Sequence, residues 1–319
     1  MIIILCGITS PALACTTILV GKDASADGCA YAGRTNDDTT MLSAKLAIFP
    51  ASDGAGSYEY VDPENGLTVS LPKANHRCII EPVYNDSPDI WWESGFNDAG
   101  VGISATETLR INQKVLAIDP FTECGMSEGN IPRLVLSYIN SAREGIFYLG
   151  NLVEQYGMTP YATDVVGNTR PIAIDRTGQS HFFMYKKGSV PIMWCCLTAP
   201  EFGVYLPVYS NVASLPDGLT VSTPEYDEKS FSWQLRLISD LAASDRTQYS
   251  ELVRSPFRNL EDNFIEAVRK EPNPTDTEAA QALEKVNRES WDCMNRVKTE
   301  LITEVSKNTV LSTRYLGQD

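Results

Sequence analysis

The first third of the chain contains short apolar runs in which hydrophobic and polar positions tend to alternate, a pattern typical of β-strands. Two of these runs, residues 15–20 and 29–34, flank a segment at 21–28 that is rich in Gly, Asp and Ser. Such an order predicts a β-hairpin. Four more strands are expected, at 44–50, 67–71, 91–95 and 101–106. The last two flank the turn-forming string Asn97-Asp98-Ala99-Gly100 and should face each other.

After Gly125 the hydrophobic positions recur with the period of a helix. This period extends over 131–139 and again over 146–153, and Gly157 stands where a helix C-cap belongs. Strand-like runs then return, at 170–174, 180–185, 191–197 and 204–208. From Lys229 onward the pattern is helical again. Long β segments flanked by helices indicate an α+β protein in which helices cover the sheets.

The last predicted helix begins near Asp276, with Thr277 as its candidate N-cap, after a loop at 271–277. Its apolar residues form one stripe: Leu283, Val286, Met294, Val297, Leu301 and Val305. A stripe of this kind faces either the core or another subunit. The sequence is therefore compatible with a homo-oligomer without requiring one.

The first fourteen residues differ from the rest of the chain. An apolar run at 2–8 is followed by Ser10-Pro11 and then by Ala12-Leu13-Ala14, a small-x-small cleavage pattern, directly before Cys15. We expect residues 1–14 to be an export signal, so that the mature protein begins at Cys15 in the periplasm or outside the cell. One alternative is a buried first strand, which Pro11 would interrupt. The other is a lipoprotein signal, which would tether the protein to a membrane and block the amine of Cys15.

Composition indicates how the chain is organised and which partners it excludes. The full chain has 319 residues, 43% of them hydrophobic, which is enough for a core at 15–225 with a helical C-terminal segment of the same domain at 226–319. The formal net charge of -15 would repel nucleic acid. After residue 14 there is no uncharged apolar run of about 18 residues, so we expect no membrane span.

The cysteines and histidines argue against a metal site. The chain has eight cysteines and only two histidines, His76 and His181, and it contains no C-x-x-C motif. A zinc site is therefore not expected. Cys6 would leave with the signal, and the cysteines other than Cys15 that remain are Cys29, Cys78, Cys124, Cys195, Cys196 and Cys293. In an exported protein these could form disulfides, and they could equally be buried free thiols.

Cys15 is the candidate nucleophile. A catalytic thiol needs a base, which is usually a histidine, but neither histidine lies in a recognisable protease motif. An α-amine, with a pKa of about 8, is the other available base. Cleavage before Cys15 would give one residue both the thiol and the free amine. Nucleophile and base would then belong to the same residue.

At this point the sequence resembles a known family. The string Cys15-Thr16-Thr17-Ile18-Leu19-Val20-Gly21-Lys22-Asp23-Ala24-Ser25, followed by Asp27-Gly28 and Gly33-Arg34-Thr35-Asn36-Asp37, resembles the start of the cysteine dipeptidases of the dipeptidase A type. These enzymes belong to the N-terminal-nucleophile superfamily, with penicillin V acylase and bile salt hydrolase as more distant relatives. The resemblance continues at 95–108, 131–157, 170–177 and 204–209.

The resemblance implies an αββα sandwich, two antiparallel sheets between helical layers, with Cys15 at the end of a central strand. It places Arg34 beside the nucleophile, where a guanidinium lowers the pKa of a thiol, and Asp37 near the α-amine, which a carboxylate can orient. Glu107 aligns near a residue of the substrate cleft, and Arg176 is similar to an arginine of that cleft. The alternatives are a surface turn for Arg34 and Asp37, an exposed strand end for Glu107 and a structural ion pair for Arg176.

In one segment the sequence departs from the family. Family members carry a long stretch between the helix pair and the Arg170-Pro171-Ile172 run, and it brings an asparagine to the oxyanion hole. Here only residues 158–169 fill that gap, and Asn168 does not match the missing asparagine. Loss of one oxyanion donor typically lowers the rate by about two to three orders of magnitude.

Together these features predict an exported cysteine hydrolase that cleaves the amide bond of small peptides, foremost dipeptides, without a metal or organic cofactor. Two alternatives stay open. One is an acylase that acts on a non-peptide amide of the bile salt or penicillin type. The other is a catalytically impaired, lipid-tethered binding protein.

Overall fold

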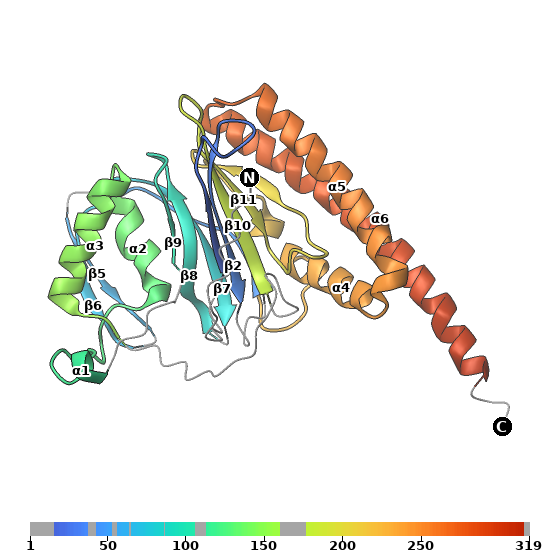
Figure 1. Cartoon of the computed structure of the whole chain (residues 1–319), viewed down its shortest axis with the longest axis horizontal. Helices are drawn as coiled ribbons and strands as arrows, with labels where there is room; N and C mark the ends of the chain where they lie inside the picture. Colours follow the sequence, from blue (N-terminus) through green and yellow to red (C-terminus); the bar gives the residue numbers. More distant parts are fainter. Residues whose placement is uncertain are drawn as a thin grey trace.

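The structure of the chain, a computed structural model, describes residues 16–37, 43–52, 56–63, 65–85, 87–105, 113–159 and 177–315. Figure 1 shows four layers: helices α2 and α3, a first and a second sheet, and then helices α4, α5 and α6. Both sheets are antiparallel throughout the described pairs. The expectation of an α+β protein with helices covering antiparallel sheets is therefore confirmed.

The sheet beside α4, α5 and α6, here called sheet A, has the order β1-β2-β10-β11-β12. Its strands are β1 (Thr16–Val20), β2 (Ala30–Asp37), β10 (Thr177–Tyr185), β11 (Ile192–Cys196) and β12 (Leu206–Tyr209). The predicted first hairpin is confirmed, because β1 pairs with β2 from Thr16↔Thr35 to Val20↔Tyr31. Gly28, with φ of 73°, supplies the left-handed conformation in the connecting turn.

The sheet beside α2 and α3, here called sheet B, has β7 and β8 at its centre. Its strands are β3 (Ser43–Ala44), β4 (Ala47–Phe49), β7 (Cys78–Asn85), β8 (Ser87–Asn97) and β9 (Gly102–Ser104). A separate hairpin is formed by β5 (Tyr58–Val61) and β6 (Thr68–Leu71). The turn predicted at 97–100 joins β8 to β9, with the Asn97 side chain accepting the Val101 N–H at 2.9 Å.

Strand β7 was not expected from the sequence. Its residues Cys78, Ile79, Ile80 and Glu81 are all buried, so the strand shows no alternation of polar and apolar positions. A strand that is buried on both faces cannot be recognised by a period of two. Between the two sheets, Glu81 of β7 is buried close to His181 of β10.

The helix expected at 131–139 is interrupted. It consists of α2 (Ile131–Val135) and a 3-10 turn, η2 (Leu136–Tyr138), and is preceded by the 3-10 turn η1 (Glu128–Asn130). Helix α3 (Ala142–Tyr156) confirms the second prediction, and Gly157, with φ of 69°, caps it by donating its N–H to the Val153 carbonyl. Two further short elements are α1 (Gln113–Leu116) and the 3-10 turn η3 (Asp217–Leu219).

Three helices follow: α4 (Phe231–Ala243), α5 (Arg246–Lys270) and α6 (Asp276–Tyr315). The expected start of α6 is confirmed, but Thr277 as its N-cap is wrong. Thr275 caps the helix instead, because its hydroxyl accepts the Glu278 N–H at 3.3 Å while its own N–H donates to the Glu278 carboxylate at 2.8 Å. This reciprocal arrangement is a capping box, and its Thr-x-x-Glu signature is present in the sequence.

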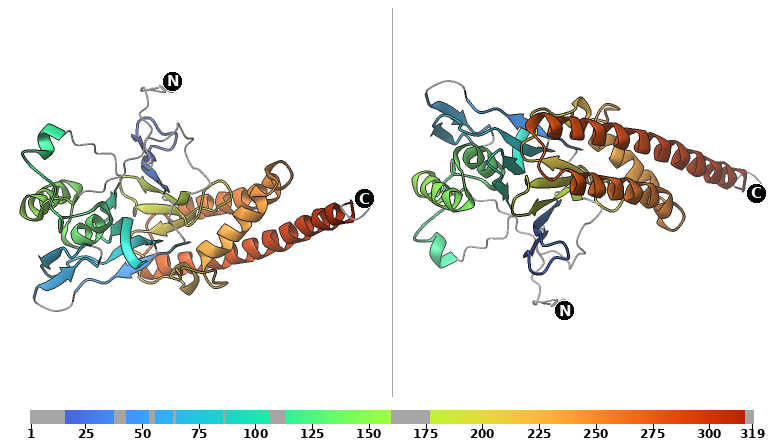
Figure 2. Two further views of the ribbon diagram at one scale, coloured as in Figure 1. Left: turned by 90° about the horizontal axis from the view of Figure 1, so that it is seen from below. Right: turned by 90° about the horizontal axis from the view of Figure 1, so that it is seen from above.

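The apolar stripe of α6 faces the interior of the chain. Leu283, Met294 and Leu301 belong to the larger of two cores, which lies between sheet A and helices α4, α5 and α6. The smaller core joins sheet B to α2, η2 and α3. Figure 2 shows that the C-terminal end of α6 extends past α4 and α5. Among the described residues, no helix is both long and apolar enough to cross a membrane.

Candidate active site

Of the five residues singled out in the sequence, Arg34 and Asp37 belong to the described structure. Cys15, Glu107 and Arg176 lie outside the described residues, as does Asn168. Cys15 directly precedes Thr16, the first residue of β1, and a peptide bond keeps consecutive Cα atoms about 3.8 Å apart. The surroundings of Thr16 and Thr17 are therefore the described part of the candidate site.

Arg34 is buried in β2, between Thr17 of β1 and His181 of β10 in the strand register. Its side chain is 1% exposed and forms an ion pair with Glu128 of η1, Nη2 to Oε1 3.1 Å. Glu128 lies 94 residues further along the chain. The surface-turn alternative does not fit this burial. The guanidinium places a positive charge on the strand that pairs with β1, and Glu128 offsets part of it.

Asp37, at the end of β2, is also buried, and two threonine hydroxyls donate to its carboxylate. Thr35 donates to Oδ2 at 3.1 Å, and Thr177 of β10 donates to Oδ1. The hydroxyl oxygen of Thr35 in turn accepts the Thr16 N–H at 3.2 Å. Asp37 is therefore connected through Thr35 to the residue that follows Cys15.

Neither threonine was singled out in the sequence, although a signal existed for Thr35. Residues two apart on a strand point to the same face, so a strand that continues to Asp37 places Thr35 and Asp37 side by side. No local pattern could identify Thr177. It reaches Asp37 only because β10 pairs with β2, with Thr177↔Asp37 in the register.

A second polar cluster lies between the two sheets, around His181 of β10. Its Nε2 lies 3.0 Å from the Ser104 hydroxyl of β9, and its Nδ1 lies 3.2 Å from Gln179 Oε1. Burial, and secondarily the charge of Arg34, lower the pKa of His181 to about 3. The ring is therefore neutral near pH 7, and its 3.5 Å approach to the buried Glu81 is not an ion pair at that pH.

The other histidine stabilises a surface connection. His76 Nδ1 lies 2.7 Å from Asp98 Oδ1, and its Nε2 lies 3.0 Å from Asn140 Oδ1. These contacts join the residues before β7 to the β8–β9 turn and to the residues before α3. His76 thus has a structural role, whereas His181 lies next to Arg34.

A cavity of about 400 Å³ opens between the sheets next to β1. Thr17 and Leu19 of β1 line it on one side, and Gly102 and Ser104 of β9 line it on the other. Its volume falls in the range of about 300–1,000 Å³ that is usual for small-molecule sites. Because it reaches Thr17, two residues from Cys15, it is the candidate substrate cleft.

The described residues contain no group of three or more His, Cys, Asp or Glu side chains that could hold a metal ion. The six described cysteines are free thiols: Cys29, Cys78, Cys124, Cys195, Cys196 and Cys293. Only Cys124 is exposed. In this structure the cysteines therefore follow the free-thiol alternative rather than the disulfide one.

Comparison with known families and proteins adds independent findings. The model of peptidase family C69 matches residues 14–166 and 160–258. A probable dipeptidase of Latilactobacillus sakei is 38% identical over 144 residues, which are 45% of this chain and 30% of that protein.

Two further relatives that are named dipeptidases match a similar share of the chain. A probable dipeptidase A of Streptococcus pyogenes serotype M1 is 39% identical over 145 residues, 45% of this chain and 30% of the relative. A dipeptidase of Bifidobacterium longum is 36% identical over 157 residues, 46% of this chain and 30% of the relative. The chain thus spans only about 30% of the length of the curated relatives that it matches.

Proposed function

The chain belongs to peptidase family C69, and we propose that it is a cysteine hydrolase that cleaves the amide bond of small peptides, foremost dipeptides. The observation that carries the proposal is the place where the family match begins, at residue 14, directly before Cys15. Its three relatives described above bear the name dipeptidase. The buried cation Arg34, on the strand paired with β1, supports a thiolate at Cys15.

In the proposed mechanism the thiol of Cys15 transfers its proton to the α-amine of the same residue, and the thiolate attacks the carbonyl carbon of the scissile amide. The ammonium then returns the proton to the leaving nitrogen, which departs as an amine and leaves a thioester on Cys15. Water attacks the thioester, the acid is released, and the thiol is restored.

The described residues have two roles in this scheme. The guanidinium of Arg34 favours the thiolate, to the extent that Glu128 does not neutralise it. Asp37, through the Thr35 hydroxyl, holds the Thr16 N–H and with it the start of β1. Arg34 and Asp37 thus influence two different properties of the nucleophile, the pKa of its thiol and the position of its backbone.

We further propose that the four layers of the fold are the αββα sandwich of the N-terminal-nucleophile hydrolases, and that the protein is exported and trimmed before Cys15. The small-x-small pattern at 12–14 supports cleavage at that bond. The cleft between the sheets, bordered by Thr17 and Ser104, supports a substrate site beside the mature N-terminus.

The experiment is hydrolysis of a panel of dipeptides by the parent protein and by Cys15→Ala. We expect the substitution to abolish turnover while the thermal unfolding temperature stays within a few degrees. Cys29→Ala is the matched control, because Cys29 is a buried free thiol in the same hairpin and should retain activity. Undiminished turnover in Cys15→Ala would contradict the proposal. Testing bile salt and penicillin amides in the same assay distinguishes a peptidase from an acylase.

A second candidate, a catalytically impaired and lipid-tethered binding protein, has specific support. The segment at 158–169 is short, and the alignment with the relatives covers about 30% of their length. Intact-mass analysis of the exported protein distinguishes the two. An unmodified chain that begins at Cys15 supports the hydrolase, and a diacylglycerol adduct on Cys15 supports the tethered protein.

A further inference from the structure

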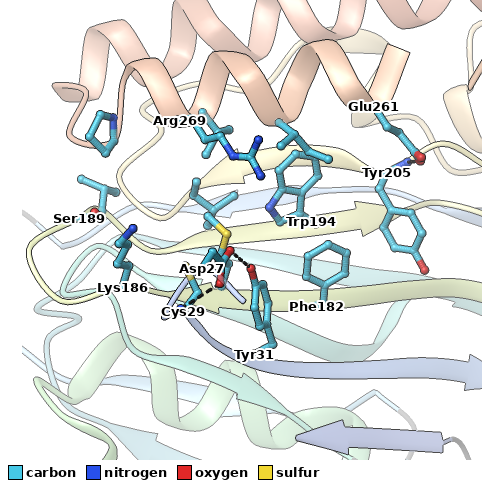
Figure 3. Close-up of a pocket in the computed structure, with 16 residues that line it drawn as sticks. Asp27, Cys29, Tyr31, Phe182, Lys186, Ser189, Trp194, Tyr205, Glu261 and Arg269 are labelled. Carbon is cyan, nitrogen blue, oxygen red and sulfur yellow. Dashed lines mark hydrogen bonds between the residues drawn. The ribbon is translucent and has the colours of Figure 1, made fainter. Parts of the chain in front are cut away.

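The helix-facing side of sheet A carries a second cavity, of about 620 Å³, between the sheet and α5 (Figure 3). Tyr31, Phe182 and Trp194 line it from the strands, and Ile265 and Val268 line it from the helix. It is distinct from the candidate active site, because neighbouring side chains on a strand point to opposite faces.

The positions of the polar partners confirm this separation. Arg34 and His181 contact Glu128 and Ser104, which lie on the side of sheet B. Phe182, next to His181 in β10, points the other way and faces α5. A molecule in this cavity would therefore be separated from the cleft between the sheets by the thickness of sheet A.

The strand side of the cavity is an aromatic wall. The rings of Phe182 and Trp194 are stacked, with centroids 5.8 Å apart and planes at 9°, and Tyr31 meets Phe182 edge-on at 6.1 Å. Met184 and Ile192 extend this wall, and Ile265 and Val268 face it from α5. Such a lining favours a ligand with an apolar body.

Trp194 also presents a buried donor that nothing in the described chain satisfies. Its side chain belongs to a residue that is 4% exposed, and Nε1 has no hydrogen-bond partner among the described residues. In Figure 3 the indole nitrogen is turned toward the middle of the ring of lining side chains. This nitrogen is itself buried, so the wall offers a ligand the indole ring and not the N–H.

Two cations border the same cavity. Lys186, just after β10, lies on the sheet side, and Arg269, near the end of α5, lies on the helix side. Within the described part of the chain, neither side chain forms an ion pair or a hydrogen bond. The acidic residues of the lining, in contrast, already accept protein donors. Asp27 accepts the Tyr31 hydroxyl and the Cys29 N–H, and Glu261 accepts the Tyr205 N–H at 2.8 Å.

We propose that this cavity binds an amphiphilic carboxylate, with its apolar body against the aromatic wall and its carboxylate between Lys186 and Arg269. Lys186 and Arg269 are the charged lining side chains that have no partner among the described residues, and both are cations, so the ligand must supply the negative charge. The overall charge of the chain is -15, so a general attraction for anions cannot account for such binding.

The test is isothermal titration calorimetry with dodecanoate below its critical micelle concentration, compared with dodecylamine, which has the same chain length and the opposite charge. We expect one dodecanoate per chain and an affinity for dodecylamine that is weaker by about tenfold or more. Arg269→Glu and Lys186→Glu should each weaken dodecanoate binding by about tenfold or more.

Lys270→Glu is the matched control, because Lys270 is adjacent on α5, is paired with Glu266 at 3.7 Å and does not line the cavity. It should leave the affinity unchanged. The proposal is overturned if dodecanoate shows no saturable binding, if dodecylamine binds equally well, or if Arg269→Glu and Lys270→Glu behave alike. Cys15→Ala should bind dodecanoate like the parent, so this result does not depend on the proposed hydrolase activity.

Discussion

Arg34 is the residue whose environment most directly bears on the chemistry of Cys15. We predict that Arg34→Leu raises the pH at which the Cys15 thiol reacts with iodoacetamide, by about one unit. The substitution removes a positive charge and keeps the negative charge of Glu128 nearby, and both effects disfavour a thiolate. Mass spectrometry of the N-terminal peptide, over a series of pH values, measures the alkylation of this thiol separately from the others.

Glu128→Gln provides the opposite change. It keeps the guanidinium but removes the carboxylate that offsets it, so the alkylation midpoint should fall. Because breaking a buried ion pair can destabilise a fold by about 3–5 kcal/mol, thermal unfolding of each variant is recorded alongside. Arg246→Leu, which affects an exposed pair with Glu201, is the control. If the profiles of Arg34→Leu and Glu128→Gln overlay the parent, Arg34 does not influence the thiol.

Thr35 gives a separate test of the hydrogen-bond chain that leads to Asp37. Thr35→Val keeps the size of the side chain but removes both the donor to Asp37 and the acceptor of the Thr16 N–H. We predict that Thr35→Val and Asp37→Asn each lower kcat by about tenfold or more, since a small displacement of a reacting group is costly, with little change in the alkylation midpoint of Cys15. If both variants have the kcat of the parent, the hydrogen bonds from Thr16 through Thr35 to Asp37 have a purely structural role. The control is Thr68→Val, an exposed position on the hairpin of β5 and β6.

At the scale of an element, the cap at the start of α6 can be tested by comparing Thr275 with Thr277. Thr275→Ala removes the side-chain half of the capping box and should lower the free energy of unfolding by about 1 kcal/mol. Thr277→Ala, at a position within the helix, should change it by less than about 0.5 kcal/mol. Urea denaturation of both variants measures the difference. Equal losses would mean that the hydrogen bonds of Thr275 do not hold the helix start.

At the scale of the whole molecule, α6 is part of the core that it shares with sheet A. Leu301 is fully buried, whereas its neighbour Ile302 is 46% exposed. Leu301→Ala should destabilise the chain by about 2–5 kcal/mol, and Ile302→Ala should have a much smaller effect. The urea midpoint should not depend on protein concentration, because the stripe packs within one chain. A midpoint that rises with concentration would indicate that the stripe also holds subunits together.

The sequence by itself determined what depends on neighbours along the chain. The β1–β2 hairpin follows from two apolar runs around a Gly-rich turn, and α3 follows from its helical period and from Gly157. The motif around Cys15, with Arg34 and Asp37 on the next strand, indicated the family because its residues are close in sequence. The capping box of Thr275 is equally local, because its Thr-x-x-Glu signature spans only four residues.

Only the tertiary structure decided which distant groups meet. Glu128 reaches Arg34 from η1, 94 residues further along the chain. Thr177 and His181 reach β2 because β10 pairs with β2, although the two strands are far apart in sequence. No local periodicity encodes such pairing, since strand order depends on how whole sheets and helices bury their apolar faces. The cavity between sheet A and α5 depends on the same packing. Its aromatic wall comes from β2, β10 and β11, and its two cations from opposite sides of the cavity.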